Sequence, residues 1–190
     1  MRWDELFADL ESQFAAAQDA ELSAEVADRI RSENARTGLA ERLAGATGRE
    51  VRVVALGGAV TTGALRRTGP DWMLIAERGG SDVLVPLASV GVVTGLTGAV
   101  AQPGGGGVVA ARLGLGHALR GIARDRLPVV VDLVDGTSTG GTVERVGRDH
   151  LDLSDAGSAR VRDAGHGPRA GPAAGPRTVP TSAVAMLRRR

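Results

Sequence analysis

The chain contains no cysteine and no lysine. The lack of cysteine excludes disulfide bonds and thiolate metal sites, and it allows a reducing compartment. All 23 basic residues are arginine, and the abundance of alanine, glycine and valine beside them indicates a GC-rich coding bias before any selection for phosphate binding. No apolar run has the length of a membrane span, and the acidic N-terminus differs from a basic leader with an apolar core. We therefore expect a cytoplasmic protein with no membrane partner.

The sequence also lacks the residue groupings that are typical of enzymes. The three histidines, His117, His150 and His166, are too scattered for paired metal-ligand spacing. The glycine-rich stretches 104–107 and 114–116 lack the Gly-Lys-Ser/Thr ending of a phosphate loop. Ser138 stands in a Gly-x-Ser-x-Gly string, but this string lies between two predicted strands and lacks the strand-to-helix turn of an activated nucleophile; Ser81 and Ser89 lack the string itself. These absences predict a non-enzymatic protein with no catalytic residue, metal ion or cofactor.

Two stretches of the chain, 78 residues apart, follow the same pattern. Residues 51–75 read VRVVALGGAVTTGALRRTGPDWMLI, and residues 129–153 read VVVDLVDGTSTGGTVERVGRDHLDL. The aligned pairs are Gly58 and Gly136, Gly63 and Gly141, Gly69 and Gly147, and Asp71 and Asp149, and each copy then closes on a Val-Pro pair, Val85-Pro86 or Val179-Pro180. Such self-similarity indicates that each copy is one structural unit.

Within each copy the apolar residues alternate with a period of two. Short apolar runs are separated by glycine-rich turns, which predicts five strands in about 45 residues. So many short strands with tight turns indicate a small, strongly bent barrel. Gly63 and Gly141 fall inside strands, where glycine usually marks a bend or a bulge. We therefore predict a first barrel over residues 50–96 and a second over residues 128–190.

The first 46 residues predict a long amphipathic, coiled-coil-like helix. Trp3, Phe7, Leu10 and Phe14 have the 4-3-4 spacing of one helix face. Such an apolar seam either docks on the body of the protein or pairs with a second copy. Residues 1–28 contain eight acidic residues and one arginine, so the small net charge of +1 conceals an acidic start and a basic remainder.

Two further segments separate or interrupt the predicted barrels. Residues 97–127 form a glycine-rich linker followed by a helix, which we expect over residues 108–126. The second copy contains an insertion, residues 155–177, made mostly of glycine, alanine, proline and arginine. This composition does not supply enough apolar surface for a packed core, so we expect a disordered basic loop.

The repeated pattern resembles the Sm-like (LSm-type) family. In the second copy the resemblance rests on Leu133, Gly136, Gly141, Val143, Val146, Gly147, Asp149, Leu151 and Leu153, followed by Val179-Pro180 and Val184. In the first copy it rests on Gly58, Gly63, Leu65, Gly69, Asp71, Met73 and Ile75, followed by Val85-Pro86 and Val90. The whole layout also resembles proteins of GC-rich actinobacteria that carry no assigned activity.

The resemblance implies an α+β, mostly β fold of two tandem five-stranded Sm-like or SH3-like barrels, each preceded by a helix. It further implies binding of single-stranded RNA and assembly into rings. The bacterial Sm-like RNA chaperone has a Lys-His step before its last strand, whereas this chain has Pro86-Leu87 and Pro180-Thr181 there. Two units are fused in this chain and one of them contains a long insertion, and both features argue against a simple six- or seven-fold ring.

Arginines supply a second indication of nucleic-acid binding. The candidate RNA-contacting residues are Arg112, Arg120, Arg124, Arg160, Arg162 and Arg169, with Trp72 as the aromatic platform for a base; Arg126, Arg177 and Arg188–Arg190 extend the basic set. Arginines bind phosphates through charge-assisted contacts. The alternatives are a solvated surface, or attraction to the acidic helix of the same or another chain. For Trp72, the alternative is a barrel-edge residue packed on a helix.

Two hypotheses follow. The first is a non-enzymatic cytoplasmic protein that binds RNA, or an RNA-containing complex, through arginine-rich segments. The second is a protein–protein adaptor or regulator, including a transcription-associated one, whose N-terminal helix engages a partner or a second copy while the barrels act as scaffold. In both hypotheses the helix acts through Trp3, Phe7, Leu10 and Phe14.

Overall fold

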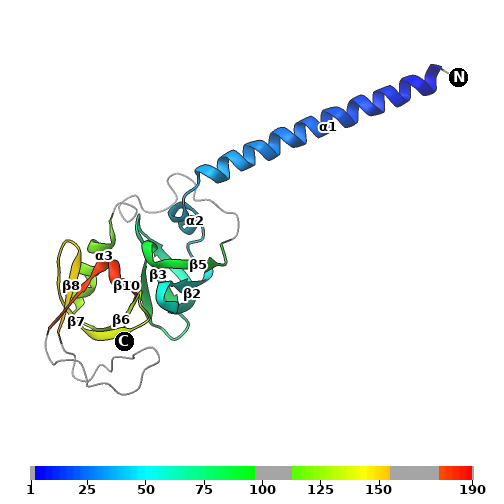
Figure 1. Cartoon of the computed structure of the whole chain (residues 1–190). Coiled ribbons are helices and arrows are strands. Elements are labelled where there is room, and N and C mark those ends of the chain that lie inside the picture. Colours follow the sequence, from blue (N-terminus) through cyan, green and yellow to red (C-terminus); the bar gives the residue numbers. More distant parts are fainter. Residues whose placement is uncertain (1–2, 97–112, 155–175, 190) are drawn as a thin grey trace. The chain divides into compact units, whose positions relative to one another are not determined.

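The computed structural model of the chain describes residues 3–96, 113–154 and 176–189. The chain divides into two compact units, Met1–Gly38 and Leu39–Arg190. The first unit contains helix α1 (Trp3–Arg36), and the second contains the other described helices and all the strands. The architecture is α+β and mostly sheet, which confirms the predicted class (Figure 1).

The predicted helix over residues 1–46 is two helices. Helix α1 ends at Arg36, and helix α2 spans Leu39–Gly45. The interruption falls at Thr37 and Gly38, and its physical reason is that a β-branched residue and a glycine are both weak helix formers. Helix α2 belongs to the second unit, where the side chain of Leu43 is fully buried in the core.

Each repeat contributes five strands to the sheet. The first repeat forms β1 (Glu50–Ala55), β2 (Val60–Thr68), β3 (Trp72–Glu77), β4 (Asp82–Pro86) and β5 (Val90–Thr94). The second forms β6 (Pro128–Leu133), β7 (Ser138–Val146), β8 (His150–Ser154), β9 (Arg177–Pro180) and β10 (Val184–Arg189). The predicted number of five strands in each copy is confirmed. Arg177, which the sequence placed in the disordered insertion, begins β9, and residues 155–175 lie outside the described residues.

The strands are joined in one antiparallel sheet with the order β5-β1-β2-β3-β4-β10-β6-β7-β8-β9. Each repeat has the same internal order, with its last strand beside its first. The repeats meet where β4 pairs with β10, and Leu84 lies opposite Leu187 in this junction. The sheet is therefore continuous through both repeats, and it is not closed into a single barrel.

The aligned glycines lie where the second strand of each repeat passes close to the third. A Cβ on Gly63 would collide with the carbonyl oxygen of Ala76, and one on Gly141 would collide with that of Ser154, the equivalent residue of the other repeat. Both strands then shift register at equivalent places, between Leu65 and Arg67 and between Val143 and Arg145. The glycines themselves mark a close approach of two strands, and the irregularity in each strand follows just beyond the glycine.

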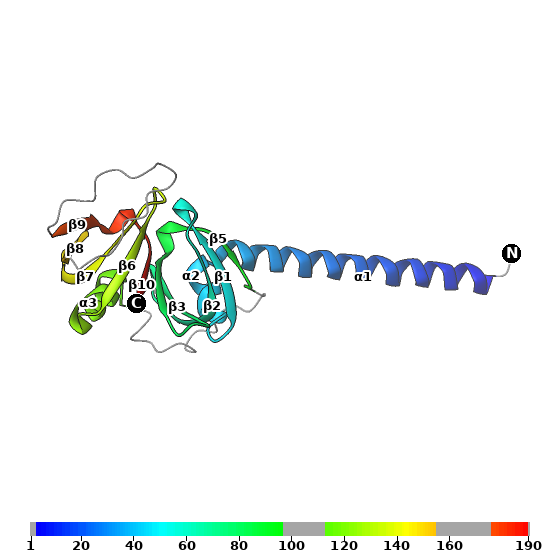
Figure 2. The same cartoon turned by 90° about the horizontal axis from the view of Figure 1, so that it is seen from below.

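The strands of the two repeats curl around two cores that exchange residues (Figure 2). The first core includes Ala185 and Met186 from β10, and the second includes Trp72 and Leu84 from β3 and β4. The buried Ser89 hydroxyl lies 2.8 Å from the carbonyl oxygen of Pro86 and 2.9 Å from that of Ala185, so it ties the repeats together at the junction.

Arg188 makes a second link between the repeats. Its guanidinium group lies 3.1 Å from Glu77 of the first repeat and 3.1 Å from Asp132 of the second. The same group donates a hydrogen bond of 2.7 Å to the carbonyl oxygen of Val60. Because the arginine is only partly exposed, removing it would leave two carboxylates without their shared cation.

Candidate functional site

A pocket of about 440 Å³ lies where the two repeats meet. Strands β2, β3 and β4 of the first repeat form one side, helix α3 (Leu115–Asp125) forms the other, and β10 contributes from the second repeat. The lining residues are Arg67, Trp72, Leu74, Asp82, Leu84, Leu113, His117, Ala118, Arg120, Gly121, Ile122, Arg124, Asp125, Leu127, Leu187 and Arg189. All of them belong to the second compact unit.

Helix α3 is fixed at its start by the first repeat. The backbone N–H of Leu115 donates a 2.8 Å hydrogen bond to Oδ1 of Asp71. Next to it, the indole N–H of Trp72 donates a 2.7 Å hydrogen bond to the carbonyl oxygen of Leu113. The Asp71 carboxylate therefore occupies the helix N-terminus, a position that favours negative charge. The predicted helix 108–126 is shorter in the structure, and residues 97–112 are outside the described part of the chain.

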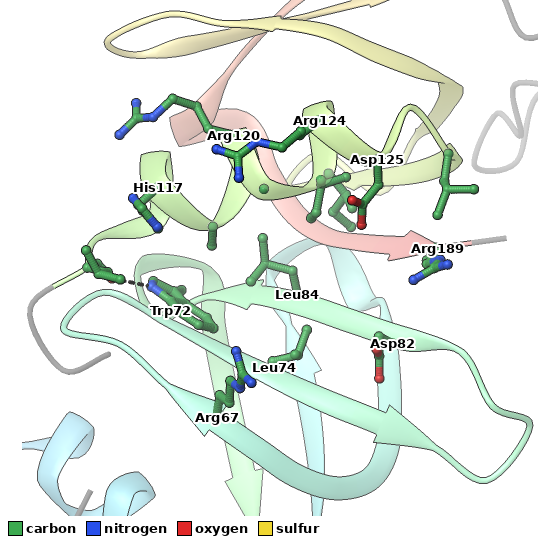
Figure 3. A pocket seen from close by; sticks show the side chains of 16 residues that line it. Arg67, Trp72, Leu74, Asp82, Leu84, His117, Arg120, Arg124, Asp125 and Arg189 are labelled. Atoms are coloured by element: carbon green, nitrogen blue, oxygen red, sulfur yellow. Dashed lines mark hydrogen bonds between the residues drawn. The ribbon is translucent and has the colours of Figure 1, made fainter. Parts of the chain in front are cut away.

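The floor of the pocket is apolar. The side chains of Trp72, Leu84 and Leu187 are buried, and those of Leu74 and Ile122 are half-buried. Figure 3 shows Leu74 and Leu84 between the strand wall and α3. This surface consists of aliphatic side chains and the indole ring of Trp72, and the indole N–H is already hydrogen-bonded to the carbonyl oxygen of Leu113.

Arginines from three elements surround this floor. Arg67 comes from β2, Arg120 and Arg124 come from α3, and Arg189 comes from β10. All four are exposed, and none forms an ion pair with another described residue. The pocket also contains Asp82 and Asp125. Four guanidinium groups against two carboxylates make the rim net positive, so the site attracts anions.

The structure brings three of the predicted RNA-contacting residues into one pocket: Trp72, Arg120 and Arg124. The other four, Arg112, Arg160, Arg162 and Arg169, lie outside the described residues. Sequence reasoning missed Arg67 and Arg189 at this site. No local spacing connects them to α3, because the sheet junction is what places them beside it.

Trp72 has little free surface for base stacking. Its side chain is 7% exposed, its ring packs against Gly69, and its N–H is hydrogen-bonded to Leu113. This placement favours the alternative interpretation, a sheet residue that packs on a helix. In the second repeat His150 packs on Gly147 in the equivalent way. A hydrogen bond of 2.9 Å joins His150 to Asp149 and lowers the pKa of that exposed carboxyl.

Helix α1 exposes large apolar side chains. Phe7 is 58% exposed and Phe14 is 65% exposed, and Leu22, Val26 and Ile30 are exposed as well. The side chains of Trp3 and Leu10, the other two predicted contact residues, are outside the described set. Two of the four predicted contact residues, Phe7 and Phe14, are therefore open on α1, and the seam as a whole stays a prediction.

Within residues 3–96, 113–154 and 176–189 no group of three or more His, Cys, Asp or Glu side chains is placed to hold a metal ion. In the same ranges, no helix combines the length and the apolar character needed to cross a membrane. Comparison of the chain with protein-family models, with curated proteins and with solved structures gives no match.

Proposed function

We propose that the chain is a cytoplasmic, non-enzymatic protein of two tandem Sm-like barrels that binds single-stranded RNA or an RNA-containing complex. In this proposal each barrel is the five strands of one repeat, preceded by α2 or α3. Three features support the two-barrel interpretation. They are the identical strand order in both repeats, the close approach of the second and third strands at Gly63 and Gly141, and the presence of two cores, each formed mostly by one repeat.

The observation that carries RNA binding is the convergence of Arg67, Arg120, Arg124 and Arg189 at one pocket. Guanidinium groups bind phosphate oxygens through charge-assisted, often bidentate hydrogen bonds. Neutralising phosphates also releases condensed counterions, and this term is independent of sequence. The arginines around the pocket supply positive charge and few groups that could distinguish the edges of bases. We therefore expect the protein to bind RNA with little sequence specificity.

The test is the affinity for a fluorescently labelled single-stranded RNA, measured by anisotropy at low salt. Arg120→Glu with Arg124→Glu should weaken binding by about tenfold or more, because two phosphate contacts become repulsive. Both residues are exposed and have no described ion-pair partner, so the fold should be retained. A melting curve of each variant checks this.

The matched control is Arg52→Glu with Arg148→Glu. It makes the same change in net charge at two other exposed arginines, one on β1 and one in the turn before β8. If the control weakens RNA binding as much as the α3 variant does, the attraction is a general charge effect and the pocket is not the site. Equal affinity of the native chain and the α3 variant would exclude the proposed contact.

A specific observation also favours the second function, a protein–protein adaptor. The side chains of Phe7 and Phe14 are exposed on α1 at the heptad spacing that places both on one helix face, and an exposed apolar face of a helix is typical of a contact with another protein. In this proposal α1 engages a partner or a second copy of the chain, and the two repeats act as scaffold.

A further inference from the structure

The volume and the apolar floor of the pocket go beyond what phosphate binding needs. Contact with an RNA backbone requires only the exposed guanidinium groups of the rim. The volume of about 440 Å³ falls in the range of small-molecule sites, about 300–1,000 Å³. Such sites are mostly apolar, with a few polar groups that fix the orientation of the ligand, and this pocket likewise combines Leu74 and Leu84 with Arg67 on the strand side and Arg120 and Arg124 on α3.

The floor selects against a nucleobase. The edges of a base carry several hydrogen-bond donors and acceptors, and burying them against Leu74, Leu84 and Ile122 would leave them unpaired. The indole N–H of Trp72 offers no partner, since it donates to the carbonyl oxygen of Leu113. A hydrocarbon chain meets no such penalty on this surface.

The rim in turn defines the charge of the ligand. Arg67 stands on the strand side of the pocket and Arg120 and Arg124 stand on the helix side, so an anionic group at the mouth has cations on both sides (Figure 3). Asp82 and Asp125 reduce the net positive charge there. The arginines still outnumber the carboxylates, so an anionic head group fits the site and a cationic one does not.

We propose that this pocket binds a small amphiphilic anion, an alkyl carboxylate, with its chain on the apolar floor and its carboxylate among the arginines of the rim. This site is separate in chemistry from the proposed RNA contact, although both use Arg120 and Arg124. The proposal does not depend on RNA binding.

Gly121 provides a way to close the pocket without weakening the fold. It lines the pocket from α3, and a Cβ placed on it meets no atom within 4 Å. A larger side chain at this position therefore extends into open space. Replacing a glycine inside a helix also raises helix propensity, so loss of binding in such a variant does not stem from unfolding.

The experiment follows Trp72 fluorescence in full-length chain carrying Trp3→Phe, which leaves Trp72 as the only tryptophan. Decanoate, kept below its micelle concentration, should produce a saturable change in emission. Gly121→Leu should weaken this binding by about tenfold or more, because the side chain occupies space that the alkyl chain needs. Gly121→Ala is the matched control and should bind decanoate with about native affinity.

Two further probes separate the parts of the ligand. Decanol has the chain without the charge, and inorganic phosphate has charge without the chain. Each should bind about tenfold more weakly than decanoate, since each lacks one of the two recognised groups. Equal binding of decanoate and decanol would overturn the role of the arginines, and equal binding of decanoate and phosphate would overturn the role of the floor.

Decanoate binding that is equal in Gly121→Leu and Gly121→Ala, or the absence of a saturable response in the parent chain, would overturn the site itself. The RNA assay distinguishes this outcome from failure of the proposed function. Gly121→Leu keeps all four arginines, so it should lower decanoate affinity by a much larger factor than RNA affinity. A chain that binds decanoate and no RNA retains this inference and loses the proposed function.

Discussion

At the scale of single residues, the glycines of the repeat differ in whether the surrounding atoms leave room for a side chain. Gly63 and Gly141 sit where the second strand passes so close to the third that a carbonyl oxygen occupies the space of a Cβ. Gly79, in contrast, lies in a turn where an added Cβ would meet no atom within 4 Å, and its φ is not positive. Packing therefore requires glycine at the two strand positions and does not require it in that turn.

Gly63→Ala and Gly141→Ala should each lower the free energy of unfolding by about 1–3 kcal/mol, because the added methyl forces the strands apart. Gly79→Ala should change it by less than about 0.5 kcal/mol. Urea unfolding of the three variants measures the difference. Equal stabilities of Gly63→Ala and Gly79→Ala would mean that the strand relaxes without cost and that the close approach does not need glycine.

A second residue-scale effect concerns Asp152 in β8. Its carboxylate accepts a 2.7 Å hydrogen bond from the Thr178 hydroxyl and a 2.9 Å hydrogen bond from the Arg145 guanidinium. These contacts, the threonine first, lower the pKa of Asp152 below its ordinary value. A lowered pKa in the folded state contributes stability above the ordinary pKa of about 3.9, and that contribution is lost as pH falls through the folded-state value.

Thr178→Val removes the hydroxyl hydrogen bond, which is the larger cause of the lowered pKa, and it should raise the pKa of Asp152 toward its ordinary value. The loss of thermal stability on acidification below about pH 4 should then become shallower than in the native chain. Thr62→Val, at an exposed position of β2, serves as control and should leave the acid profile unchanged. Carboxyl chemical shifts during an acid titration report the pKa directly; an unchanged Asp152 titration would contradict the assignment.

At the scale of elements, the strands were predictable and the boundaries of the helices less so. Period-two alternation between glycine turns locates the ten strands, since a half-buried strand imposes that pattern on its own residues. The helix interruption at Thr37 and Gly38 escaped prediction, because the residues on both sides are good helix formers and one weak pair does not change their pattern.

The pairing of β4 with β10 was also not predictable from the sequence. Both are edge strands of their own repeats, and the alternation of Val83 and Leu84 does not specify which strand lies beside them. The candidate pocket depends on this pairing, so only its α3 arginines and Trp72 could be found from local patterns. Arg67 and Arg189 reach the site through the tertiary fold.

Helix α1 supports a prediction at this scale. Phe7→Asp with Phe14→Asp should abolish association of the chain with itself, because a contact that buries the two rings would have to bury charge. Light scattering should give the mass of a single chain for this variant and a larger mass for the native chain. Gln18→Asp with Ser23→Asp adds the same charge at exposed polar positions of α1 and should leave the native mass unchanged.

Two other outcomes would contradict self-association through α1. If the native chain already has the mass of one molecule, α1 does not join two copies of the chain, and its exposed phenylalanines would have to contact a different protein. If the Phe7 and Phe14 variant loses its strand signal in circular dichroism, the seam belongs to the folded core instead.

At the scale of the whole molecule, the two repeats form one sheet and differ where the candidate site lies. Trp72 anchors α3 in the first repeat, whereas His150 holds the equivalent place in the second. The pocket needs strands from the first repeat, the helix before the second, and the end of β10. The duplicated features therefore build the scaffold, and the features that are not shared bring Arg67, Arg120, Arg124 and Arg189 together.

The most direct measurement is the salt dependence of single-stranded RNA binding. If the four arginines contact phosphates, the logarithm of the binding constant should fall linearly with the logarithm of salt concentration, with a slope of about −3. Arg120→Gln with Arg124→Gln should make that slope shallower by about 1.4, because two phosphate contacts are lost and each contributes about 0.7 on single-stranded RNA. A flat salt response, no binding at low salt, or the same slope in the native chain and the double variant would contradict RNA binding at this site.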